Sequence, residues 1–132
     1  MKPPHVELLD LFGNWGRFSM DIPVLTLEEG RIYTIMGANG SGKTTLLNLL
    51  ALQKSPAQGV YRYRGEAVDV SSKSRVCQIR KEMAYLVQFP YMFHKSGYEN
   101  IALPLVIQKK GRAEIRDRVE RIIEELNISS FV

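Results

Sequence analysis

The glycine-rich segment Gly37-Ala38-Asn39-Gly40-Ser41-Gly42-Lys43-Thr44 constrains the fold of this chain more than any other feature. It matches G-x-x-x-x-G-K-[ST] at every fixed position, a pattern in which a tight loop joins a buried strand to a helix. The flanks agree with this, because the apolar run 31–36 precedes the loop and the leucine-rich run 44–52 follows it. We therefore predict a strand over 31–36, a buried helix over 44–52 and an α/β fold.

The residue types in this loop suit a phosphate ligand. Glycines allow the backbone to turn tightly around an anion with its N–H groups pointing inward. The positive end of the following helix dipole adds to the same field. Lys43 would place a point charge on the β- and γ-phosphates, and the Thr44 hydroxyl can coordinate Mg²⁺. The loop therefore predicts a site for a nucleoside triphosphate with magnesium.

Composition argues against several other functions. The 132 residues carry 18 Lys and Arg against 14 Asp and Glu, and this net charge of +4 is too small to argue for a nucleic-acid partner. The single cysteine, Cys77, cannot form an internal disulfide, which favours a reducing compartment. No apolar run approaches the ~20 residues needed to span a bilayer. We expect a cytoplasmic protein that binds no nucleic acid.

The rest of the chain alternates between strand and helix patterns. The clearest is the helix expected after Gly111, where four apolar residues recur at helical spacing and three i,i+4 charge pairs occupy the solvent side. The stripe is Ile115, Val119, Ile122 and Leu126, and the pairs are Glu114–Arg118, Arg116–Glu120 and Asp117–Arg121. The other expected strands are one at 6–11, an edge strand in 18–28 containing Pro23, a strand pair in 58–69 turning near Gly65, and one at 83–87. A turn is expected around Trp15. The other expected helices are a crossover at 71–82 and a helix at 96–110 with Pro104 in its early part.

Four segments together resemble the ATP-binding subunits of ABC transporters. Residues 36–47 are similar to the Walker A region in the form this family favours, G-x-N-G-S-G-K-[ST]-T-L. The stretch 6–16, with Trp15, resembles the N-terminal strand and its adenine-stacking aromatic. Residues 85–93 and 97–101 resemble the Q-loop and the following helix start. The resemblance covers the chain from about residue 6 onward.

The resemblance implies roles for individual residues. Trp15 would stack on adenine, with packing beside the glycines as the alternative and Phe12 or Phe18 as replacements. Gln88 would reach Mg²⁺ or the water near the γ-phosphate, unless it is a strand-end glutamine facing solvent. The implied ATP-binding residues are Trp15, Gly37, Asn39, Gly40, Ser41, Gly42, Lys43, Thr44, Thr45 and Gln88, and the implied Mg²⁺ ligands are Thr44 and Gln88.

The resemblance also implies partners and a location. Residues 89–99 would dock onto a transmembrane permease subunit, although core packing of Phe89 to Phe93 is the alternative. A second ATP-binding subunit would complete the system. The chain would then lie in the cytoplasm against the inner face of the cell membrane and bind Mg-ATP to power solute transport.

The chain departs from the family pattern in its catalytic carboxylates. The candidates for a Walker B strand are Leu8-Leu9-Asp10, Ala67-Val68-Asp69 and Ile122-Ile123-Glu124-Glu125, and none has the required context. No L-S-G-G-Q signature occurs either, so we assign no catalytic residue. A nucleotide-binding module or truncated fragment without hydrolysis is the alternative function, whereas the N-G-S-G-K-T-T-L form argues against a small-molecule kinase.

Together with the resemblance, these departures imply that the chain corresponds to the N-terminal portion of an ABC-type P-loop ATPase. We expect 1–94 to form part of the nucleotide-binding core and 95–132 to start the helical subdomain. The sheet would be incomplete, with antiparallel N-terminal strands. The strands at 31–36 and 83–87 would lack their neighbours, leaving unpaired backbone groups and exposed apolar faces.

Overall fold

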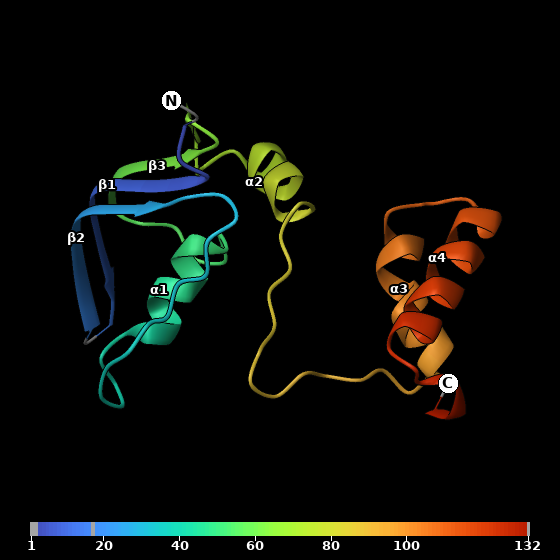
Figure 1. The fold of residues 1–132 in the computed structure, drawn as a ribbon. Coiled ribbons are helices and arrows are strands. Elements are labelled where there is room, and N and C mark those ends of the chain that lie inside the picture. Colours follow the sequence, from blue (N-terminus) through green and yellow to red (C-terminus); the bar gives the residue numbers. More distant parts are fainter. Residues whose placement is uncertain (1–2, 17, 132) are drawn as a thin grey trace. The chain divides into compact units, whose positions relative to one another are not determined.

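A computed structural model describes residues 3–16 and 18–131 (Figure 1). The chain divides between Tyr85 and Leu86 into two compact units. We call the residues up to Tyr85 the first unit and those from Leu86 onward the second unit.

The first unit contains an antiparallel sheet whose strands lie in the order β2-β1-β3-β4. The strands are β1 (Val6–Trp15), β2 (Phe18–Leu27), β3 (Gln58–Tyr63) and β4 (Glu66–Ala67). The edge position of β2 confirms the prediction from Pro23, and β3 with β4 confirms the strand pair in 58–69. Strand β1 extends beyond the predicted 6–11 because its pairing with β2 continues to Trp15 opposite Phe18.

A β-bulge interrupts the pairing of β1 with β3. The register shifts between Leu9 and Phe12, where Asp10 takes a φ of 45° and Gly59 on the facing strand takes 99°. A Cβ at Gly59 would overlap the backbone at Asp10 and Leu11, so only glycine fits there.

The core of the first unit lies between the sheet and two helices, α1 (Lys43–Leu50) and α2 (Lys73–Arg80) (Figure 1). Leu8, Leu11, Leu49 and Ile79 are almost fully buried there. Tyr61 is buried beside them, and its hydroxyl donates a 2.7 Å hydrogen bond to the carbonyl of Leu50. Burial raises the pKa of this phenol. These contacts fix helix α1, and with it the loop that precedes the helix, on the sheet.

The strands predicted at 31–36 and 83–87 are absent from the described structure, where both segments lack regular secondary structure. Ile32 is 97% exposed, Met36 87% and Leu86 88%. A buried strand needs hydrogen-bonding neighbours, and the described residues supply none beside these segments. The secondary-structure prediction is therefore wrong here, while the expectation that both segments lack neighbours is confirmed.

The second unit contains helices α3 (Gly97–Ile107) and α4 (Arg112–Glu125), which pack against each other, and the short 3-10 turn η1 (Ser129–Phe131). Ser96 and Glu99 form a capping box at the start of α3. Pro104 is inside α3 as its eighth residue, so the prediction that the early part of this helix carries it is wrong. Buried Ala102 and Val119 are the centre of this packing.

The apolar stripe of α4 is only partly covered. Val119 is buried, whereas Ile122 is 39% and Leu126 63% exposed. Of the three predicted charge pairs, the described structure forms only Glu114–Arg118, at 2.8 Å, because Arg116 pairs with Asp117 instead. No helix in the described part of the chain is long and apolar enough to cross a bilayer.

Candidate functional site

The glycine-rich loop occupies residues 37–42 of the first unit and runs directly into α1. Gly40 has a φ of 80° and Gly42, the residue before the helix, has 93°. These left-handed conformations favour glycine, because a side chain there strains the backbone. A Cβ at Gly42 would also overlap the ring of Phe18 and approach the Met20 methyl to 2.8 Å. Strand β2 therefore supports the loop at the start of α1, a contact that residue spacing did not reveal.

Lys43 holds its charge inside this loop. Its Nζ donates hydrogen bonds to the carbonyls of Gly37 and Ala38, each at 2.8 Å. The Ser41 N–H closes the turn by donating to the Ala38 carbonyl at 3.3 Å. The ammonium is therefore fixed against the backbone that would surround an anion.

Nothing in the first turn of α1 repels an anion or caps its N–H groups. Gly42 supplies no side-chain cap, and the first turn contains no acidic residue. The exposed positive end of the helix dipole therefore adds to the Lys43 charge. The donor set fits a triphosphate with Mg²⁺, since the exposed Thr44 offers a hydroxyl oxygen, a ligand type that Mg²⁺ prefers. Among the described residues, no cluster of three or more His, Cys, Asp or Glu side chains forms a separate metal site.

Trp15 is half-buried in the first unit, and its six-membered ring covers Gly13 so closely that a Cβ at Gly13 would overlap it. The Nζ of Lys54 lies over the same indole, 5.2 Å from the ring centroid. This geometry matches the packing alternative, and stacking on adenine stays a prediction. Phe18 is the aromatic residue that packs on the loop, whereas Phe12 is 37% exposed on β1.

A side-chain hydrogen bond joins α1 to the end of the first unit. The Tyr85 hydroxyl donates to the Asn48 side-chain oxygen at 2.8 Å, and both side chains are partly buried. The two residues are separated by 37 positions, so nothing in the local sequence indicates their contact. Helix α1 is thus linked both to the loop and to segment 83–85.

Gln88 and the predicted docking segment lie in the second unit. Gln88 is exposed. Four neighbouring apolar side chains are exposed instead of packed in a core: Phe89 at 84%, Tyr91 at 71%, Met92 at 62% and Phe93 at 49%. The structure therefore does not show the alternative, in which Phe89 to Phe93 pack in a core.

Asn100 organises the chain between this segment and α3. Its Oδ1 accepts from the Phe93 N–H at 2.9 Å, and its Nδ2 donates to carbonyls of Phe93, Lys95 and Ser96 at 3.0–3.2 Å. The backbone just after the exposed aromatics is therefore held by side-chain hydrogen bonds from a helix.

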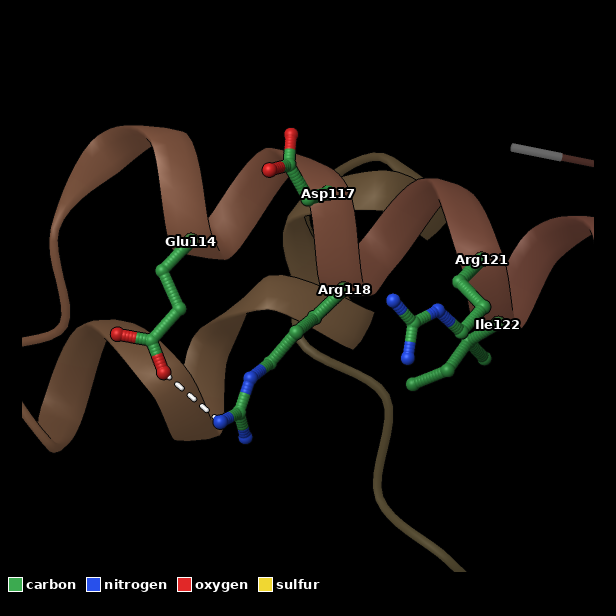
Figure 2. A pocket seen from close by; sticks show the side chains of 5 residues that line it. All are labelled: Glu114, Asp117, Arg118, Arg121 and Ile122. Atoms are coloured by element: carbon green, nitrogen blue, oxygen red, sulfur yellow. Dashed lines mark ion pairs between the residues drawn. The ribbon is translucent and has the colours of Figure 1, made fainter.

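A separate hollow of about 670 Å³ lies along α4 in the second unit (Figure 2). Its lining includes Glu114 and Arg118, joined by their 2.8 Å ion pair, together with Asp117, Arg121 and Ile122. It contains none of the residues predicted to bind a nucleotide.

Comparison with known proteins finds a matching family model and several relatives. A family model described as ABC transporter matches residues 21–132. The macrolide export ATP-binding/permease protein MacB of Wolinella succinogenes is 33% identical over 97% of this chain and 21% of its own length. The lipoprotein-releasing system ATP-binding protein LolD of Aquifex aeolicus is 30% identical over 79% of this chain and 47% of its own length.

Solved structures share the fold. The chain superposes on cbiO1 from Clostridium perfringens with a TM-score of 0.83 and 22% identity, covering 98% of this chain and 53% of that one. The dimeric ATP-binding cassette MJ0796, described as bound to ADP and Pi, gives a TM-score of 0.74 at 23% identity, covering 96% of this chain and 59% of that one. The chain thus spans about half the length of these cassettes.

Proposed function

Because this chain belongs to the ABC transporter family as an ATP-binding domain, we propose that it binds Mg-ATP at Gly37–Thr44 and couples that binding to transport through a membrane partner. The observation that carries the proposal is the position of Lys43. Its ammonium is held by the carbonyls of Gly37 and Ala38, beside the uncapped N-terminus of α1. Both features concentrate positive potential at one loop.

The proposed contacts follow the chemistry of each group. Lys43 would pair with the β- and γ-phosphates, while Thr44 and Gln88 would coordinate Mg²⁺ through their side-chain oxygens. Trp15 would stack on the base. The backbone N–H groups would surround the phosphates, and the full set is Trp15, Gly37, Asn39, Gly40, Ser41, Gly42, Lys43, Thr44, Thr45 and Gln88.

The names of the relatives support proposed partners. MacB is named an ATP-binding/permease protein, cbiO1 is described as part of an ABC transporter complex, and MJ0796 as dimeric. We propose that residues 89–99 dock onto a permease, since exposed aromatic side chains are enriched at interfaces. A second ATP-binding subunit would face this one at the cytoplasmic side of the membrane. Residues 1–94 would belong to the nucleotide-binding core and 95–132 to the helical subdomain.

Nucleotide binding without turnover is the second candidate, and one contact favours it. The Asp69 carboxylate accepts hydrogen bonds from the Ser71 hydroxyl at 2.6 Å and the Ser71 N–H at 2.9 Å, which lower its pKa. This carboxylate is engaged in a local turn and is poorly suited to activate water. Lys43-dependent release of phosphate from ATP by the purified, monodisperse chain would contradict this candidate.

Calorimetry tests the binding proposal. Mg-ATP should bind the wild-type chain and the control Lys81→Ala, which removes an exposed lysine elsewhere in the first unit. Lys43→Ala should lose most of the affinity, because the phosphate charge loses its hydrogen-bonded partner. Equal affinities in all three proteins would overturn the proposal.

A further inference from the structure

The indole of Trp15 is covered on one side by the backbone of its own strand. Trp15 and Gly13 are two residues apart in β1, so they share a face of the sheet. Three consecutive atoms of the six-membered ring would lie within 3.0 Å of a Cβ at Gly13. Only the absence of a side chain at Gly13 permits this packing. A ligand that stacks on Trp15 must therefore use the side of the ring that faces away from Gly13.

Lys54 lies over the indole, with its Nζ 5.2 Å from the ring centroid. An ammonium at this distance is attracted by the negative face of the ring. Lys54 is half-buried. A lysine therefore occupies the region above the indole that a stacking base would need.

The turn after α1 determines where Lys54 lies. The N–H groups of Gln53 and Lys54 both donate to the Asn48 carbonyl, at 2.7 and 3.2 Å. Leu52 is buried in a left-handed conformation with a φ of 54°, which directs the chain back toward the sheet. Lys54 thus follows the end of the helix whose beginning carries Lys43. The backbone that supports Lys54 is fixed by hydrogen bonds and by burial of its neighbour.

We propose that Lys54 weakens the binding of a nucleotide base by competing with it for the face of Trp15. This inference rests on the proposed function, because it requires that a nucleotide base stacks on Trp15. A cation–π contact at a partly exposed site contributes roughly 2- to 5-fold in a binding equilibrium. Stacking of a base on an aromatic ring contributes about 5- to 150-fold. A stacking base can therefore displace the ammonium, but its affinity is lower by about 2- to 5-fold than it would be without Lys54.

Lys54→Met tests the proposal on the complete chain, because methionine removes the charge while keeping an unbranched side chain. The affinities of Mg-ATP and of Mg-tripolyphosphate, which has no base, are measured by calorimetry and by the fluorescence of Trp15, the only tryptophan. Lys81→Met is the control for loss of one positive charge, and Lys54→Arg retains a cation over the ring.

In Lys54→Met the ratio of ATP affinity to tripolyphosphate affinity should rise about 2- to 5-fold. Lys81→Met and Lys54→Arg should keep the wild-type ratio. Without ligand, the emission of Trp15 should differ from wild type in Lys54→Met and remain unchanged in Lys81→Met. If Lys54→Met binds both ligands and its ratio of ATP affinity to tripolyphosphate affinity is unchanged or lowered, the role of Lys54 is overturned while the proposed function stands. Failure of the wild-type chain to bind either ligand would overturn the proposed function, and this inference with it.

Discussion

The hydroxyl of Tyr85 donates a 2.8 Å hydrogen bond to the side-chain oxygen of Asn48, so the last residue of the first unit is attached to α1. Lys43 and Thr44 are in the first turn of the same helix. The helix that starts at the glycine-rich loop therefore also anchors the end of the first unit.

Tyr85→Phe removes this hydrogen bond without changing the ring. We expect the free energy of unfolding to fall by about 1–3 kcal/mol, because the partly buried Asn48 oxygen loses its donor. Tyr33→Phe is the matched control, since the Tyr33 hydroxyl accepts an exposed hydrogen bond from the Glu28 N–H. Denaturant unfolding measures both variants. Equal midpoints for the two would show that the Asn48 contact contributes nothing specific.

Gly42→Ala tests the contact between the glycine-rich loop and strand β2. Both Gly40 and Gly42 have positive φ, but a Cβ at Gly42 meets Phe18 while one at Gly40 meets open space. Gly40→Ala should therefore lower the free energy of unfolding only through backbone strain, by about 1–2 kcal/mol. Gly42→Ala should lower it clearly more, because its Cβ also overlaps Phe18. Unfolding curves of the two variants provide the comparison. Phe18→Ala in the Gly42→Ala background should recover part of the difference, and no recovery would contradict the overlap.

The carboxylate of Glu99 is predicted to titrate below its ordinary value. Hydrogen bonds from the Ser96 N–H and hydroxyl, at 3.0 and 3.1 Å, lower its pKa from 4.5. Because the folded pKa is the lower one, this capping contribution is complete above about pH 4.5 and disappears as the pH falls through the folded value. An NMR titration of the Glu99 side chain measures its pKa in the folded chain directly. A pKa at or above 4.5 would be inconsistent with the capping box.

The exposed segments 31–36 and 83–87 should cause the chain to associate with itself. Ile32, which is 97% exposed, lies in an apolar segment without a strand neighbour among the described residues. Ile32→Lys should reduce association, because charges protect unpaired edges. The control Ile107→Lys introduces the same charge at a 72% exposed site on α3. Sedimentation velocity compares the two, and an equal effect would show that segment 31–36 has no special role.

Sequence reasoning succeeded where the signal is local. The loop at 37–44 and the helix after it follow from glycines and leucines that are adjacent in the chain, and Pro23 alone places β2 at an edge because it lacks an N–H donor. The helix from Arg112 to Glu125 follows from the spacing of its apolar residues.

Sequence reasoning failed where the outcome depends on distant residues. The run 31–36 has strand composition, yet a strand requires a neighbour, and composition does not report whether one is present. The contacts of Phe18 with Gly42 and of Lys54 with Trp15 join positions 24 and 39 residues apart. Such pairs are determined by how the sheet and α1 pack, which no spacing rule encodes.

The location of the nucleotide is the central claim, and amide NMR of the complete chain tests it most directly. Titration with Mg-ATP should shift the backbone amides of residues 37–45, with Gly40 and Gly42 among the largest changes, because these N–H groups would surround the phosphates. The same titration of Lys43→Ala should leave them unchanged. Shifts in this loop that persist in Lys43→Ala, or shifts confined to other parts of the chain, would contradict the account.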